Sequence, residues 1–282
     1  MSAEETVMPA TTAAAVARVR KPGGPGRVWV WLPPILVFLL LIGLWYLAYF
    51  WFIWIGRPGV VPTLHEVLEV FTFDKVRAEL LNGLWVDVVG SFVGLMIASA
   101  IGILWAILMN SAKWFERSTY PYAVVLQSIP ILAISPLISV VVQDGFWSRI
   151  VVCVLIALFP MVSNTFFGLR AVDRAHLELF QLQGASWWTR LTKLQLPAAS
   201  PAIFAGLRIS AGLSVVGAIV GDFFFQQGGS KGLGTLMRTF QAQASTEALF
   251  AAVLLASLLG VAVFLLFGLV ARLAVGKWYE FG

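Results

Sequence analysis

Six long apolar runs, almost free of charged residues, divide this chain of 282 residues. A run of about 20 apolar residues is what an α-helix needs to cross the hydrocarbon of a bilayer. Hydrophobic residues make up 60% of the sequence and charged residues only 12%, whereas an ordinary soluble domain carries about 45–50% and about 25%. We therefore expect an all-α membrane protein with about six transmembrane helices, over residues 33–55, 84–109, 122–142, 146–168, 202–225 and 249–273.

Prolines interrupt the third and fourth runs, at Pro130, Pro136 and Pro160. Proline removes a helical hydrogen bond and clashes with the preceding turn, and irregular backbone at membrane depth is tolerated where it lines a cavity. We therefore expect both spans to be kinked or broken beside a cavity. The polar side chains next to these prolines either satisfy the freed backbone groups or line a solute path; they are Ser128, Ser135, Asn164 and Thr165.

Two segments outside the runs have patterns of their own. Residues 1–27 are mostly small and polar and end in several basic residues. The apolar run that follows continues to Ile55, which is longer than the roughly 7–15 apolar residues of a cleaved signal peptide. We expect a disordered cytoplasmic tail over 1–27 and a transmembrane domain over 28–282. The alternation of apolar and charged residues over 63–80 predicts an interfacial helix on the outer side.

The distribution of Lys and Arg predicts the orientation of the spans. With six spans and the N-terminus inside, twelve basic residues fall on the inner side and six on the outer side, Arg149 among them, and Arg208 falls within a span. Short cytoplasmic loops carry an excess of basic residues. We therefore expect both termini to be cytoplasmic.

Several kinds of chemistry are disfavoured by the sequence. Cys153 is the only cysteine, and the two histidines, His65 and His176, are far apart, so a metal site is not expected. The glycine-rich stretch 228–232 lacks the G-K-[ST] ending of a phosphate-binding loop. The basic residues are scattered rather than clustered, which argues against nucleic acid. We expect no cofactor and no catalytic site on this chain.

The longest inner connection, residues 169–200, has the pattern of two short helices. Asp173 can cap a helix that continues through Leu182, and Gly184 can supply the turn that follows. A second amphipathic stretch covers 187–194. Two helices with apolar stripes that face water rather than lipid predict a protein partner.

The spacing within this connection resembles the hallmark loop of binding-protein-dependent ABC importer permeases, E-A-A, three residues, G, nine residues, I-x-L-P. Here the loop has Glu178-Leu179-Phe180, Gly184, and Leu194-Gln195-Leu196-Pro197. Motifs around Pro130, Pro160, Arg208 and Asp222 are similar to those of the branch that handles nitrate, taurine, sulfonates, riboflavin and pyrimidine precursors. The resemblance implies a type I importer-like permease whose ATPase-coupling residues are Glu178, Leu179, Phe180, Gly184, Ala185, Leu194, Leu196 and Pro197.

The resemblance also implies partners. Two ATPase subunits would bind ATP and Mg, a second copy of this chain would complete the path, and an extracytoplasmic substrate-binding protein would deliver the solute. The assembly would lie in a bacterial inner membrane and import a small solute by alternating access.

Charged and small residues within the spans are further candidates. A mid-span Arg208 should face protein, water or an anion, and Asp87 and Asp222 lie near the outer span ends, where a hydrated carboxylate is tolerable. Candidate path or gate residues are Asp222, Arg208, Ser128, Asn164 and Asp87. Small residues at four-residue spacing allow close helix approach, and the expected contact between two copies uses Gly206, Ser210 and Ser214.

Three other functions remain open at this stage. An ion-gradient-driven secondary transporter usually has inverted repeats with broken helices in matching places, and here the prolines cluster in spans three and four only. A membrane hydrolase needs a nucleophile with a nearby base, and the spans contain no histidine. A scaffold would not require the spaced inner loop.

Overall fold

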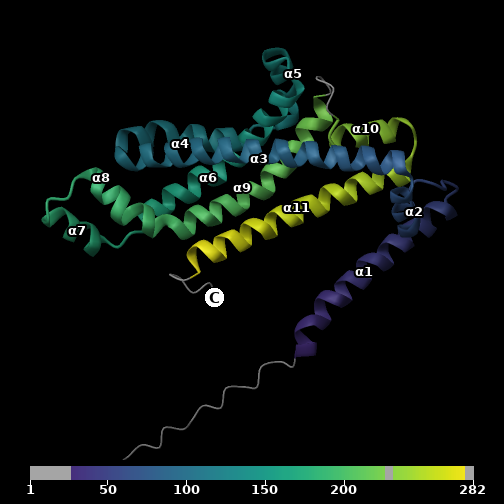
Figure 1. Cartoon of the computed structure of the whole chain (residues 1–282), viewed down its shortest axis with the longest axis horizontal. Helices are drawn as coiled ribbons and strands as arrows, with labels where there is room; N and C mark the ends of the chain where they lie inside the picture. Colours follow the sequence, from purple (N-terminus) through teal and green to yellow (C-terminus); the bar gives the residue numbers. More distant parts are fainter. Residues whose placement is uncertain (1–26, 226–230, 277–282) are drawn as a thin grey trace, which may run out of the picture. The chain divides into compact units, whose positions relative to one another are not determined.

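The computed structural model describes residues 27–225 and 231–276, and the regular elements within these ranges are all helical (Figure 1). The long helices are α1 (Arg27–Trp54), α3 (Asp74–Ser111), α6 (Gly145–Arg170), α9 (Leu196–Phe224) and α11 (Thr246–Val275). The shorter elements are α2 (Leu64–Glu69), η1 (Val70–Thr72), α4 (Lys113–Ser128), α5 (Ile131–Val142), α7 (Arg174–Leu182), α8 (Trp187–Arg190), η2 (Leu191–Gln195) and α10 (Leu233–Ala242).

The chain forms two compact units, Met1–Arg57 and Pro58–Gly282. Helix α1 belongs to the first unit, carries no charged residue after Arg27, and exposes most of its side chains between Leu32 and Trp54. A helix that is apolar on every face suits lipid rather than water. The helix expected for the first span is therefore confirmed, whereas the expected tail lies outside the described residues except for Arg27, which begins α1.

The second unit contains the remaining spans. Helices α3, α6, α9 and α11 are each long and apolar enough to cross a membrane, and the bent pair α4 and α5 makes a further span if counted as one. The break between α4 and α5, a bend of 106°, falls at Ile129 and Pro130 as expected (Figure 1). The described residues thus contain five helices that are long and apolar enough to cross a membrane, or six if the bent pair is one span.

Of the expected kink or break in the fourth span, the break is absent from the described helix. Helix α6 continues through Pro160 without interruption, and α5 likewise continues through Pro136. Around Pro160, the Asn164 amide and the Ser163 hydroxyl donate hydrogen bonds to the Pro160 carbonyl at 2.8 and 3.3 Å. Pro160 has no N–H to bond the Ile156 carbonyl, and packing of α6 against its neighbouring helices lets the helix accommodate this loss.

Close packing of α9 against α6 forms the centre of this unit. A Cβ atom added at Gly217 would lie 2.7 Å from the Cys153 Cα, and one added at Gly221 would lie 2.9 Å from the Arg149 Cα. The absence of side chains at these glycines lets the two backbones approach, which is how helices associate in lipid.

The single outer helix expected over 63–80 is also wrong. The segment contains α2, η1 and the beginning of α3, separated by an extended Phe73. Thr63 and Glu66 form a capping box at the start of α2. The apolar side chains Val67, Val70 and Leu80 are buried against α10 and α11. Burial within the fold divides the segment into separate elements.

Candidate functional site

The inner connection folds as its sequence predicts. The Asp173 carboxylate accepts a hydrogen bond of 3.1 Å from the Ala175 N–H and caps α7. Gly184 has a φ of +69°, a conformation that favours glycine. The Ser186 hydroxyl accepts from the Thr189 N–H at 3.2 Å and caps α8. The expected Asp173 cap, helix and glycine turn are all confirmed.

This connection exposes several large apolar side chains. No residue of α7 is buried. Leu182 is 87% exposed and Trp188 is 63% exposed, and Glu178 and Leu179 are exposed beside them. Exposed large apolar side chains grouped on two short helices mark a surface for a protein partner.

The same connection is firmly attached to the spans. Leu191 is buried in a cluster with Met109, Phe166 and Leu169, and the Asn110 amide donates to the Gln195 side-chain oxygen at 3.1 Å. From Trp187 to Phe224 the chain forms one continuous helical segment. A force applied to α8 therefore acts directly on α9, and a force applied to α7 reaches α9 through the turn at Gly184.

A cavity of about 390 Å³ lies among α4, α5, α6 and α9. Its wall is mostly apolar, with polar side chains from Gln127, Ser163 and Asn164. The break between α4 and α5 opens beside it, since Ile129 and Ile131 line the cavity. Of the five candidate path residues, only Asn164 lines this cavity.

Ser128 and Arg208 lie elsewhere. The Ser128 hydroxyl donates a hydrogen bond of 3.1 Å to the Val124 carbonyl, so it satisfies a backbone group of α4. Arg208 places its guanidinium over the Phe264 ring of α11, 4.0 Å from the ring centroid.

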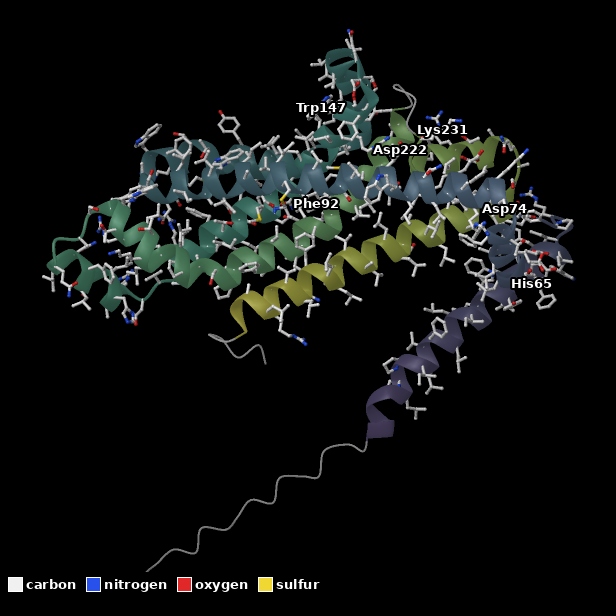
Figure 2. The ribbon with its side chains drawn as sticks, viewed as in Figure 1. His65, Asp74, Phe92, Trp147, Asp222 and Lys231 are labelled. Carbon is white, nitrogen blue, oxygen red and sulfur yellow. The ribbon has the colours of Figure 1, made fainter. Side chains whose placement is uncertain are left out.

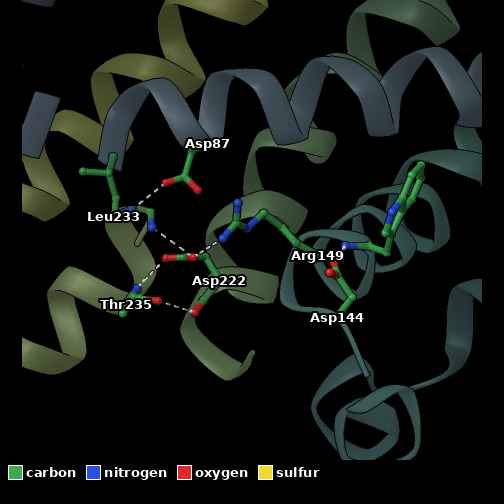
Figure 3. Close-up of polar contacts among 8 residues, drawn as sticks. Asp87, Asp144, Arg149, Asp222, Leu233 and Thr235 are labelled. Atoms are coloured by element: carbon green, nitrogen blue, oxygen red, sulfur yellow. Dashed lines mark hydrogen bonds and ion pairs between the residues drawn. The ribbon is translucent and has the colours of Figure 1, made fainter. Parts of the chain in front are cut away.

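Asp87 and Asp222 meet in a buried charge cluster with Arg149 (Figure 3). Arg149 of α6 forms an ion pair with Asp222 of α9. The Asp222 carboxylate also accepts from the N–H groups of Gly232 at 3.1 Å and Thr235 at 2.5 Å, and Asp87 of α3 accepts from the Leu233 N–H at 2.9 Å. Two carboxylates from two spans thus hold the N-terminus of α10, where negative charge is favourable.

Gly232 is required at this point of the cluster. A Cβ there would lie 2.5 Å from one Asp87 oxygen and 2.8 Å from the Asp222 carboxyl carbon. Asp222 lies where α9 approaches α10 and α3, inside the bundle rather than on its surface (Figure 2).

The expected hydrated position of the two aspartates is therefore wrong. Asp87 and Asp222 are both 0% exposed and line none of the described cavities. Sequence reasoning also missed Arg149, which was assigned to the outer side and is 1% exposed in the bundle. The available signal was that these three charges all fall within apolar runs, where unlike charges pair.

The predicted contact between two copies is also corrected. Gly206, Ser210 and Ser214 are buried within a single chain. A Cβ at Gly206 would lie 2.8 Å from the Asn164 Cβ, and the Ser210 hydroxyl donates to the Ala157 carbonyl at 2.8 Å. Gly206 and Ser210 thus pack against α6 of the same chain, whereas Ser214 lines a small pocket with residues of α3 and α11.

The spans, the cavity and the exposed helices α7 and α8 together are typical of a membrane transport subunit. Residues 98–275 match the family model described as a binding-protein-dependent transport system inner membrane component, and the chain belongs to that family. It is thus an ABC transporter permease of the inner membrane, as the loop spacing predicts.

Relatives and one solved structure agree with this assignment. The formylaminopyrimidine transport permease ThiX of Halalkalibacterium halodurans is 32% identical over 82% of this chain and 89% of its own length. The riboflavin transport permease RibX of Chloroflexus aurantiacus is 32% identical over 59% and 60%. A chain of the inward-facing MetNI methionine ABC transporter has the same fold, with a TM-score of 0.62 at 18% identity, over 71% of this chain and 98% of that one.

Proposed function

We propose that this chain forms half of the path for a small solute in an ATP-driven importer and that α7 and α8 couple it to the ATPase. The observation that carries the proposal is the group of exposed apolar side chains on α7 and α8. Helix α8 continues without a break into α9, and a short turn at Gly184 joins α7 to α8. An unpartnered surface at the end of a long rigid helix suits the transmission of movement.

The energy that this coupling requires is substantial. Shifting a two-state population from 1:99 to 99:1 takes about 5.5 kcal/mol of differential binding. ATP acts on this chain only through a partner that binds the two orientations unequally. The partner therefore has to bind the whole surface of α7 and α8. Loss of the apolar contacts there should uncouple ATP hydrolysis from transport.

The proposed assembly contains two ATPase subunits with ATP and Mg, two copies of this chain and an extracytoplasmic substrate-binding protein. The ATPase subunits bind at α7, with both termini of the chain on the same, cytoplasmic side. The opposite end of the bundle, where α10 is held by the buried charge cluster, faces the binding protein.

The described cavity favours an uncharged solute. Its wall combines aromatic and aliphatic surface from Phe159 and Leu155 with uncharged polar groups, and no ionisable side chain lines it. Pockets of this kind bind apolar bodies and use a few polar groups for orientation. A small heterocycle fits this wall better than an inorganic anion.

The test is binding-protein-stimulated ATP hydrolysis by the reconstituted complex. Leu182→Asp adds a charge to the most exposed apolar side chain of α7, and it should abolish stimulation while membrane insertion remains normal, because Leu182 contributes little to the core. Gln181→Asp is the matched control, since Gln181 is an exposed neighbour that is already polar, and it should retain most of the stimulation. Full stimulation of Leu182→Asp would refute the proposed coupling.

A further inference from the structure

Arg208 is held in the seam between α9 and α11. Its guanidinium carbon lies 4.0 Å from the centroid of the Phe264 ring. A Cβ at Gly268 would lie 3.0 Å from the same carbon and from the Arg208 Nε, so the missing side chain at Gly268 leaves room for the guanidinium against α11. Gly206 and Ser210, two residues to either side, face α6. Arg208 therefore points away from the cavity and toward α11.

The charge of Arg208 is not neutralised within the described part of the chain. No ion pair joins it to the described residues, and its Nε is buried without a hydrogen-bond partner there. The Phe264 ring supplies a cation–π contact, which attracts the cation without neutralising it. Arginines within membrane spans normally pair with an acidic or carbonyl group, so a counterion from outside this fold is expected.

The depth of Arg208 matches a lipid phosphate. Arg208 and Phe224, the last residue of α9, are separated by about 24 Å of helix. If the outer hydrocarbon boundary lies at Phe224, a hydrocarbon core about 30 Å thick ends about 6 Å beyond Arg208, on the side of α7. Arg272 follows Gly268 by one helical turn on the same face of α11 and is exposed. Both side chains can thus reach the phosphate level of one leaflet.

The surroundings are aliphatic rather than aqueous. On α11, Leu265, Leu269 and Leu273 are 60%, 53% and 71% exposed. A solute path in water would carry polar groups, as the cavity near Asn164 does. Exposed leucines beside two arginines are typical of a lipid-facing helix that ends in the headgroup layer.

The described residues of a second copy offer no carboxylate at this depth. Among the described residues, Asp87 and Asp222 are the acidic side chains deep within the spans, and both are fully buried in the charge cluster. Helix α1 carries no acidic residue. The remaining described acidic residues lie near or beyond the helix ends: Glu66, Glu69, Asp74, Glu79, Glu116, Asp144, Asp173, Glu178 and Glu247.

We propose that Arg208 and Arg272, set against Gly268 of α11, bind the phosphate of an anionic phospholipid from the leaflet on the α7 side. The lipid phosphate accepts hydrogen bonds from both guanidinium groups, and the acyl chains lie along the exposed leucines of α11. The lipid supplies the negative charge that Arg208 lacks among the described residues of the chain.

Lipid binding to the delipidated full-length chain, counted by native mass spectrometry, tests the site. Titration with phosphatidylglycerol and with phosphatidylcholine should show a clear preference for the anionic lipid. Arg208→Gln and Arg272→Gln should each weaken phosphatidylglycerol binding about fivefold and leave phosphatidylcholine unchanged. Arg272 is exposed at the end of α11, so its replacement keeps the test valid even if Arg208→Gln folds poorly.

Two controls separate a positioned site from general charge attraction. Gly268→Ala keeps both arginines but pushes the Arg208 guanidinium away from α11, and it should also reduce the preference. Lys75→Gln removes an exposed cation at the start of α3 and should have no effect. Inorganic phosphate should not compete. Equal binding of the two lipids would overturn the proposal. A preference for the anionic lipid that survives both arginine substitutions would also overturn it, as would an Arg208→Gln protein that loses self-association while its lipid binding is unchanged.

Discussion

Replacing Asp222 by asparagine tests the buried charge cluster. The carboxylate accepts bonds from Arg149 and from the N–H groups of Gly232 and Thr235. Asparagine has nearly the same shape, but its NH₂ group must face at least one of these donors. Breaking a buried ion pair by removing one partner costs about 3–5 kcal/mol, and we expect Asp222→Asn to lose a free energy of unfolding in this range. The release of α10 from the bundle should accompany the loss.

Unfolding in mixed micelles, followed by tryptophan fluorescence, measures this loss. Asp144→Asn is the matched control, because Asp144 is exposed and caps α6 by accepting from the Trp147 N–H at 2.9 Å, a role that asparagine performs about equally well. We expect it to cost less than about 1 kcal/mol. The combined replacement of Arg149 and Asp222 by leucine should cost less than the sum of the two single replacements. An Asp222→Asn protein as stable as the control, or strict additivity, would refute the proposed ion pair.

Three further predictions follow from other parts of the structure. Asn164→Leu adds apolar bulk to the cavity wall and removes a polar group, so solute uptake should fall severalfold while assembly with the ATPase, measured by co-purification, is unchanged. A cysteine at Ile209, which is 45% exposed, should cross-link two copies under oxidant if α9 faces its counterpart, whereas one at the buried Ser214 should not; the reverse pattern would contradict the packing of α9. The Thr63 backbone N–H, and less strongly its hydroxyl, lower the pKa of Glu66 from its usual 4.5, so the capping box contributes stability above about pH 4.5 that is lost as the pH falls through the folded pKa. The protection of α2 amides, measured as their hydrogen-exchange rate relative to an unstructured peptide at the same pH, should decrease as the pH falls through the folded pKa in the native chain and be less pH-dependent in Thr63→Ala.

Local features were predictable from the sequence because they depend on neighbours along the chain. The apolar runs predicted the spans, and Asp173 and Gly184 predicted the boundaries of α7 from capping and turn preferences alone. The break at Pro130 was predictable for the same reason. The continuity of α6 through Pro160 was not, since it depends on side chains and neighbouring helices that periodicity does not reveal.

Partners distant in the sequence were the main omission. Arg149 lies near the start of an apolar run, and its pairing with Asp222 requires α6 and α9 to pack side by side at that level. The small residues Gly206 and Ser210 correctly indicated a close helix contact, but the contacted helix is α6 of the same chain. A stripe specifies that two helices approach closely and leaves the second helix undetermined.

Solute uptake into sealed vesicles that contain the assembled complex tests the central claim most directly. The proposed mechanism predicts uptake that requires ATP, persists when ionophores collapse all ion gradients, and disappears in Leu182→Asp while Gln181→Asp retains it. Uptake by this chain alone, driven by an ion gradient without an ATPase, would contradict it and support a secondary transporter.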